Sequence, residues 1–389
     1  MAETEQFDAI VIGAGVVGTA TALALTNADL KVLVIDRGNV AQGTTSAGEG
    51  NILVSDKEPS PELDLALRSR DAWFEVNEDI GGGFELEAKG GLVVARSEGG
   101  LANLYKLSKE QRSSGIDAQD LSTIELRTLE PNLSHAVTNG TFYPQDAQCQ
   151  PMLAAAQMLR AVKSRGGKFL FGAEVIAIES WQGSVSAVIT SKGRFASPIV
   201  INATGTWAGQ IAALAGSYLP IAPRRGFILV TAPSPKIIFH KVYDAEYVAN
   251  VASDDSDLQS SAVVEGTQNG TILIGASRER VGFKNGIEFP ILRILARQAI
   301  ALFPILSDIQ LLRVYRGFRP YAPDHLPVIG EDPHIRGLWH NAGHEGAGIG
   351  LAPASAELIT DGIMQRTSFM NPAPFSPSRF AHDESGVRA

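Results

Sequence analysis

An apolar stretch at residues 7–12 leads into a glycine-rich turn, a run of small residues, and a second apolar stretch at residues 31–35. Both apolar stretches are short and rich in β-branched residues, which is typical of buried parallel strands. The small residues between them favour a helix that packs closely on the strands. The pattern therefore predicts a strand, a tight turn, a helix and a second strand at the start of the chain.

Three glycines separate the first predicted strand from this helix. Gly13, Gly15 and Gly18 have the spacing of a dinucleotide-binding turn, and Asp36 ends the second strand. In this arrangement the glycines allow the tight turn, the approach of a pyrophosphate, and close helix packing, in that order. The helix N-terminus binds the phosphates and the acid binds ribose hydroxyls. A Rossmann-like unit is predicted, because an unrelated glycine turn leaves Asp36 unexplained.

Further elements follow along the chain. Helical periodicity predicts helices over residues 61–79, 101–114, 124–130, 151–165 and 290–303. Short apolar runs predict a strand pair over 84–95, and strands over 168–171, 175–180, 185–191, 198–203, 226–230, 262–265 and 271–275. The runs within 168–191 are expected to form a β-meander, and residues 338–364 a final strand, turn and helix.

This order of elements predicts an α/β fold class with two domains. A Rossmann-like dinucleotide-binding domain with a β-meander is expected to take residues 1–85, 145–218 and 319–370. A second, mostly β (α+β) domain would bind the substrate and take the insertions 86–144 and 219–318. Residues 371–389, which are rich in proline and serine, are expected to form a surface or disordered tail.

Composition limits the expected partners. The formal net charge of −9 disfavours nucleic acid and anionic membranes as partners. The sequence has no apolar run of about 18 residues for a membrane span, and its N-terminus lacks the pattern of a signal peptide. The single cysteine, Cys149, excludes an internal disulfide and a cysteine metal cluster, and no metal site is predicted. We therefore expect a cytoplasmic protein that binds small molecules.

Three later segments distinguish FAD from NAD as the dinucleotide. Residues 199–207 (Ile-Val-Ile-Asn-Ala-Thr-Gly-Thr-Trp) resemble the flavoprotein strand that returns to the pyrophosphate. Residues 317–330 carry an Arg-Pro…Asp…Pro-x-Ile-Gly pattern, and residues 340–349 form a second glycine-rich loop before a helix. Together with the N-terminal motif, these segments resemble the D-amino-acid oxidase family of FAD enzymes, which includes glycine oxidase and sarcosine oxidase. The resemblance covers most of the chain.

The resemblance implies a set of contacts with FAD. The second glycine-rich loop would place a helix N-terminus near the negative charge of reduced flavin, with packing alone as its alternative role. The hydroxyls at positions 44–46 would bind the cofactor, with turn chemistry as their alternative. The residues expected at FAD are Gly13, Gly15, Val17, Gly18, Asp36, Arg37, Thr44, Thr45, Ser46, Gly50, Asn51, Val175, Thr204, Gly205, Trp207, Gly346, Ala347, Gly348 and Ile349.

Arg319 is the residue expected to bind the substrate. A guanidinium forms a bidentate pair with a carboxylate and so fixes the orientation of a small amino acid. In the resembling enzymes, the arginine of the Arg-Pro motif has this role. A structural salt bridge between Arg319 and a nearby acid such as Asp324 is the alternative. Arg316 is a weaker competitor, because three residues along a strand place it on the opposite face.

Three further side chains are candidates around the substrate. Tyr243 and Tyr247 would cap the carboxylate from above, although a core or surface position is an alternative for both. The resemblance places His344 near the flavin, where shaping its loop is a better-supported role than proton transfer.

The resemblance implies oxidation of an amine or amino acid, with transfer of the Cα hydride to flavin N5 and hydrolysis of the imine. Non-covalent FAD is expected, because residues 315–320 lack the cysteine that sarcosine oxidase-like members use for attachment. Residues 45–62 resemble dehydrogenase subunits that oxidise secondary amines such as proline or opines, with a partner subunit or electron-acceptor protein. A stand-alone, oxygen-using oxidase is the main alternative. An NAD(P)-linked dehydrogenase and a non-catalytic flavin-binding subunit are alternatives of other classes.

Overall fold

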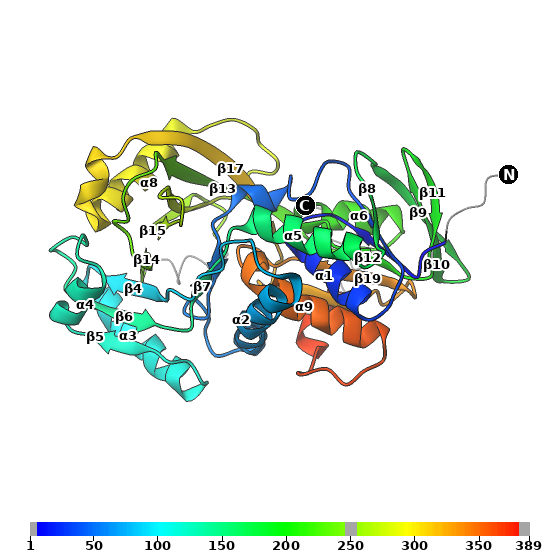
Figure 1. Cartoon of the computed structure of the whole chain (residues 1–389), viewed down its shortest axis with the longest axis horizontal. Coiled ribbons are helices and arrows are strands. Elements are labelled where there is room, and N and C mark those ends of the chain that lie inside the picture. Colours follow the sequence, from blue (N-terminus) through cyan, green and yellow to red (C-terminus); the bar gives the residue numbers. More distant parts are fainter. Residues whose placement is uncertain (1–5, 246–254, 381–389) are drawn as a thin grey trace.

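The structure is a computed structural model that describes residues 6–245 and 255–380. Two lobes lie along the long axis of the molecule (Figure 1), each built on its own sheet. Chain segments from distant parts of the sequence make up both lobes. The α/β fold class expected from the sequence is confirmed.

The first lobe contains a six-stranded sheet in the order β18-β19-β12-β1-β2-β8. All neighbouring strands are parallel except β18 and β19. The strands are β1 (Ala9–Ile12), β2 (Val32–Ile35), β8 (Lys168–Leu170), β12 (Val200–Asn202), β18 (Val328–Glu331) and β19 (Leu338–Ala342). The helices of this lobe are α1 (Val16–Asn27), α2 (Pro61–Ile80), α5 (Pro151–Ser164), α6 (Ala208–Leu214) and α9 (Gly348–Ile363). Helix α1 is buried between the sheet, α5 and α9, which explains its small side chains.

The β-meander differs in part from the expected one. It consists of β9 (Val175–Trp181), β10 (Ser184–Thr190) and β11 (Gly193–Ala196). The run that begins at Lys168 pairs with β2 instead and extends the parallel sheet. Periodicity showed that this run is a strand but not which strand it pairs with, because that choice depends on non-local contacts.

The second lobe contains an eight-stranded sheet in the order β17-β13-β16-β15-β14-β4-β6-β5. Its strands are β4 (Gly91–Ala95), β5 (Gln119–Leu121), β6 (Asn139–Tyr143), β13 (Ala222–Thr231), β14 (Lys241–Asp244), β15 (Gln259–Gly266), β16 (Ile272–Arg278) and β17 (Leu311–Tyr321). Its helices are α3 (Glu98–Ser113), α4 (Thr123–Leu129) and α8 (Phe289–Leu302). Parallel pairing of β4 with β14 joins the two insertions into one sheet. The strands β3 (Asn51–Ile52) and β7 (Ala147–Gln148) form a separate, antiparallel two-stranded ladder.

Two sequence-based expectations are corrected here. The predicted strand pair over residues 84–95 is a single strand, β4, preceded by an irregular segment with one bridge between Glu87 and Gln148. The expected domain boundary at residue 319 falls inside β17, which stays paired with β13 through Tyr321. Of the expected surface or disordered tail, residues 371–380 are described and lie mostly on the surface, with Phe375 fully buried and Arg379 bound to Asp324 at 2.6 Å.

Candidate active site

A cavity of about 860 Å³ is lined by residues of both lobes. The turn after β1, the end of β2 and the start of α9 line it from the first lobe, and β13 and β17 from the second. The following residues expected at the cofactor line it: Gly13, Gly15, Val17, Asp36, Arg37, Thr44, Thr45, Asn51, Val175, Thr204, Gly205, Trp207, Gly346, Gly348 and Ile349. The remaining expected residues, Gly18, Ser46, Gly50 and Ala347, do not line it.

The turn after β1 is built so that only glycines fit. Gly13 has φ of +109°, and a Cβ there would lie 2.5 Å from the carbonyl oxygen of Ala203. A Cβ on Gly18 would collide with the carbonyl oxygen of Gly13. Gly18 therefore acts on the cofactor through packing of α1 against the turn, although it does not line the cavity itself.

Asp36 is held rigidly at the end of β2. Its Oδ2 accepts a hydrogen bond from the backbone N–H of Ala14 at 2.8 Å, and its Oδ1 from that of Gly38 at 2.7 Å. Each carboxylate oxygen keeps a second lone pair for another donor. This position beside the glycine turn suits two ribose hydroxyls.

Two helices start at the cavity. The N-cap residues of α1 and α9, Gly15 and Ala347, make no side-chain cap bond, and Gly15 and Gly348 line the cavity. Trp73 and Ser69 of α2 donate to the first carbonyl oxygens of α9, Ile349 at 3.0 Å and Gly350 at 2.6 Å, and so fix its first turn. The positive ends of both helix dipoles therefore favour anionic groups in this cavity.

Hydroxyl groups attach the loop after β2 to its neighbours. Thr45 Oγ1 accepts from the N–H of Val16 at 3.0 Å, and Thr44 donates to the carbonyl oxygen of Phe318 at 2.8 Å. Ser46 donates to the carbonyl oxygens of Gln42 and Gly43, which is turn chemistry. The alternative role, stabilising a turn, therefore fits Ser46. Thr44 and Thr45 each make a structural hydrogen bond and also line the cavity.

Aromatic side chains line another part of the cavity. The guanidinium of Arg37 lies 4.4 Å from the ring centre of Trp207, and that ring stacks on Phe283 at 5.6 Å. Phe283 in turn meets Phe318 edge-on at 5.2 Å. The stack of a cation and rings fixes the shape of the cavity wall where both Arg37 and Trp207 contact its interior.

Arg319 lies on β17 and lines the cavity. Its Nη1 donates to the carbonyl oxygen of Ser277 at 2.8 Å. A Cβ on Gly226 would collide with Nη1, and one on Gly346 would lie 3.4 Å from Nε. The guanidinium therefore lies between two glycines, one on β13 and one beside the start of α9.

Two residues named as alternatives to a ligand role for Arg319 lie elsewhere. Asp324, the acid named as an example of a salt-bridge partner, binds Arg379 through both carboxylate oxygens. Arg316 donates to Asn285 and does not line the cavity. Of the three arginines on β17, Arg313, Arg316 and Arg319, only Arg319 lines the cavity.

His344 lines the cavity but carries no charge at neutral pH. Burial lowers its pKa from 6.5 to about 3, and its Nε2 lies 3.0 Å from Ser355 Oγ on α9. This bond to the helix supports a role in shaping the loop before α9.

The pKa of His344 predicts a loss of stability in acid. The unfolded chain takes up a proton near pH 6.5 but the native state does so only near pH 3, so this contribution is constant above pH 6.5 and falls as pH drops below it. Between pH 7.5 and pH 5 we expect a loss of about 2 kcal/mol in the free energy of unfolding from this residue. Urea unfolding of the FAD-saturated protein at both pH values measures it. His344→Gln should lack this part of the loss, and an equal loss in the variant would refute the assignment.

Of the two tyrosines expected above the substrate, only Tyr243 lies within the described residues. Tyr243 is fully buried on β14, with its hydroxyl 2.6 Å from Ser55 Oγ, and does not line the cavity. A role above the substrate does not fit this position, and the alternative of a core tyrosine does. Tyr247 lies outside the described residues.

Sequence reasoning missed Glu49. This residue lines the cavity although its side chain is only 4% exposed. It is the one acidic residue in the loop of residues 37–51, a signal that could have identified it. The cavity also includes Gly317, Phe318 and Glu345, which lie inside the two C-terminal motifs but were not singled out, and Gly226, which no motif marked.

Within the described ranges 6–245 and 255–380, no group of three or more histidine, cysteine, aspartate or glutamate side chains could hold a metal ion. The same part of the chain contains no helix with the length and apolar character that crossing a membrane requires.

The model of the FAD dependent oxidoreductase (DAO) family matches residues 8–362. The chain belongs to this family. Its relatives include the glycine oxidase of Geobacillus kaustophilus, which is 28% identical and matches over 97% of this chain and 98% of its own. The hydrogen cyanide synthase subunit HcnC of Pseudomonas aeruginosa is 27% identical, over 85% and 77% of the two chains.

Solved structures of other enzymes have the same fold as this FAD-dependent oxidoreductase. The glycine oxidase of Geobacillus kaustophilus superposes with a TM-score of 0.87 at 27% identity, over 97% of this chain and 99% of that one. The L-proline dehydrogenase of P. horikoshii shares the fold, with a TM-score of 0.89 at 24% identity over 98% and 99% of the two chains. The resemblance to the D-amino-acid oxidase family is confirmed.

The residues of the cavity fit FAD. The two uncapped helix N-termini suit the pyrophosphate and the flavin, and the glycine turn leaves no room for a side chain beside them. Asp36 offers lone pairs to the ribose. The family match to FAD enzymes leaves the NAD(P)-linked alternative without support.

Proposed function

We propose that this FAD-dependent oxidoreductase oxidises a small amino acid or secondary amino acid whose carboxylate binds Arg319. The observation that carries this proposal is the position of the Arg319 guanidinium, in the cavity between Gly226 and Gly346 and next to the start of α9. A carboxylate there accepts a charge-assisted bidentate pair, which orients the Cα–H bond of the ligand. The glycine oxidase relatives support a small amino acid as substrate.

Bound FAD supplies the acceptor for a hydride, and the protein binds, orients and excludes water. Arg319 fixes the carboxylate, and the glycines around it let the ligand approach the backbone closely. The N-terminus of α9 stabilises negative charge that develops near Gly348. His344 stays neutral, so it adds no second positive charge beside Arg319.

Absorbance of the purified protein tests the proposal. We expect flavin bands that bleach under anaerobic conditions with one or more members of a panel of D- and L-amino acids, glycine, sarcosine, proline and opines. A flavoprotein that no member bleaches would refute the substrate class.

We also expect acid to release FAD and the denatured chain to have the mass of the polypeptide alone, because Cys149 is buried outside the cavity. An added mass of one FAD would refute non-covalent binding.

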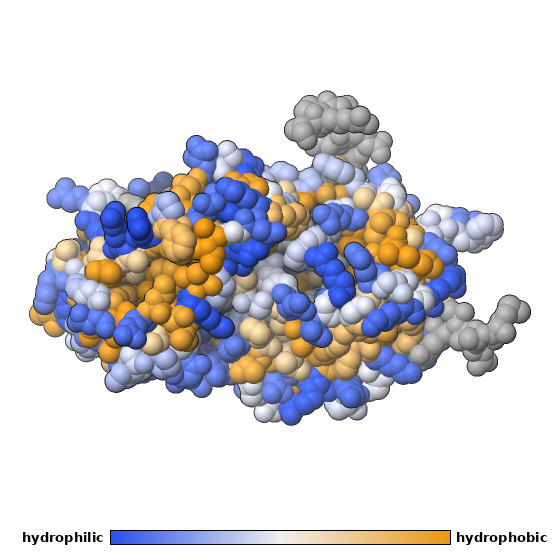
Figure 2. Space-filling view, turned by 90° about the horizontal axis from the view of Figure 1, so that it is seen from above, coloured by the Kyte–Doolittle hydropathy of each residue, from blue (hydrophilic) through white to orange (hydrophobic). Residues whose placement is uncertain are grey.

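A dehydrogenase subunit is the second candidate. It is supported by the relatives named as subunits of hydrogen cyanide synthase. Large apolar side chains are also exposed, among them Phe289 at 68%, Leu312 at 60% and Ile176 at 54%. Figure 2 shows apolar residues gathered on both halves of one face. Little peroxide formation with oxygen, together with fast reduction of a dye, would favour this candidate over a stand-alone oxidase. A cytoplasmic location remains part of this proposal, supported by the single cysteine.

A further inference from the structure

Glu49 combines deep burial with an unused acceptor atom. Its Oε2 accepts from the side-chain amide of Asn51 at 3.2 Å and lies 3.7 Å from Nζ of Lys241. Its Oε1 has no hydrogen-bond partner among the described residues. Because a buried carboxylate oxygen without a donor is costly, this atom indicates a donor that arrives in the cavity.

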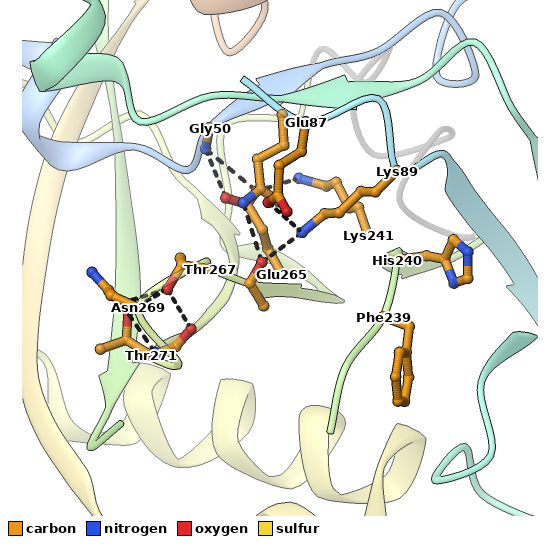
Figure 3. A network of polar contacts seen from close by, with 12 residues as sticks. Gly50, Glu87, Lys89, Phe239, His240, Lys241, Glu265, Thr267, Asn269 and Thr271 are labelled. Atoms are coloured by element: carbon orange, nitrogen blue, oxygen red, sulfur yellow. Dashed lines mark hydrogen bonds and ion pairs between the residues drawn. The ribbon is translucent and has the colours of Figure 1, made fainter. Parts of the chain in front are cut away.

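Charged side chains lie close to Glu49. Lys241 is shared between Glu49 and Glu265, whose Oε2 lies 3.5 Å from Nζ. Figure 3 shows Lys89 and Glu87 beside Lys241 and Glu265.

The neighbours already show the effect of burial. Desolvation raises the pKa of the Glu265 carboxyl and lowers the pKa of the Lys89 amine. Tyr315 faces the same site from β17, donates to the carbonyl oxygen of Gly48 at 3.0 Å, and has a pKa raised by burial.

We infer that Glu49 accepts the proton of the substrate's ammonium group, and this inference rests on the proposed function. Arg319 and Glu49 line the same cavity, so a zwitterionic amino acid meets a cation for its carboxylate and an anion for its ammonium. A protonated amine cannot form an imine, because its nitrogen lone pair is occupied. The N–H bond breaks and Oε1–H forms. The Cα–H bond then breaks with its electron pair going to bound FAD, and the nitrogen lone pair makes the C=N bond.

The first test needs no variant. It uses the FAD-loaded wild-type protein and the α-methylated analogue of the substrate, which has no Cα hydrogen and cannot be oxidised. We expect its affinity, followed by the flavin spectrum, to be independent of pH below the pKa of its amine, and an indicator dye to show no proton release. An affinity that rises about tenfold per pH unit, or release of about one proton per site, would overturn the inference.

The second test uses Glu49→Gln, which keeps the size of the side chain but cannot accept a proton. We expect flavin reduction at pH 7 to slow about 100-fold or more, and its rate to rise about tenfold per pH unit. Binding of the analogue should now release about one proton. Glu49→Asp keeps an acceptor and should restore part of the rate and the flat pH profile. A flat pH profile in FAD-loaded Glu49→Gln would overturn the inference.

Glu87→Gln is the matched control. It removes a charge from the same cluster, but Glu87 does not line the active-site cavity, so the rate and its pH profile should stay within about twofold of the wild type. The two proposals fail differently. If nothing in the panel bleaches the wild-type flavin, the proposed function fails and the role of Glu49 falls with it. If the flavin bleaches and Glu49→Gln behaves as the wild type does, only the role of Glu49 fails.

Discussion

Replacing Arg319 with alanine is expected to weaken substrate binding about 100-fold or more, which corresponds to about 3 kcal/mol. The substitution removes a charge-assisted, bidentate pair with the ligand carboxylate. The dissociation constant of the α-methylated analogue, measured from the flavin difference spectrum, is the direct readout. kcat/KM for the substrate itself should fall by at least the same factor.

Two variants control this prediction. Arg316→Ala removes another arginine of β17, which binds Asn285 outside the cavity, and should leave the dissociation constant unchanged. Arg319→Lys keeps the charge but loses the bidentate geometry, so it should recover only part of the affinity. Equal affinity in the wild type and in Arg319→Ala would place the carboxylate elsewhere.

Gly18→Ala is expected to abolish stable FAD binding, with less than about a tenth of the wild-type FAD content after purification. The added Cβ would collide with the carbonyl oxygen of Gly13, so α1 must move away from the turn that it helps to form. Both sides of this contact belong to packed backbone, one in the turn after β1 and one in α1. Neither can move without disturbing the packing around it. The ratio of flavin to protein absorbance, and titration of the FAD-free protein with FAD, measure the effect.

Gly99→Ala is the matched control, because nothing lies within 4 Å of a Cβ at Gly99 on α3. It should leave FAD content unchanged and raise the free energy of unfolding by about 0.5–1 kcal/mol, the usual gain of alanine over glycine in a helix. If both variants lost FAD equally, the collision at Gly18 would not be the cause.

Local patterns predicted the elements of this protein well. The helices over 61–80 and 151–164 begin at prolines, and the strands at 9–12 and 32–35 are continuous apolar runs, so each is specified by neighbouring residues. The run from Lys168 was assigned to the wrong sheet, because a three-residue strand has no local feature that selects its partner. The same limit applies to residues 84–90, where alternation of apolar residues did not produce a strand.

The site residues also divide into those that the local sequence specifies and those that only the packing of distant segments places. The glycine turn, Asp36 and Arg319 were found from sequence because the geometry of a dinucleotide and a carboxylate demands these residue types at fixed spacing. Tyr243 was misplaced because no strand was predicted at residues 241–244. The pairing of β14 with β4, which joins segments far apart in the sequence, places it in the core.

The sequence by itself determined the α/β class, the FAD-binding turn and the arginine that awaits a carboxylate, since short-range spacing encodes all three. Only the tertiary structure decided which side chains share the cavity. It pairs Asp324 with Arg379 and places Arg319 in the cavity, and it brings Glu49, Lys241 and Glu265 together from three distant segments. Charge neutralisation in a buried site depends on distance in space, which no local pattern along the chain records.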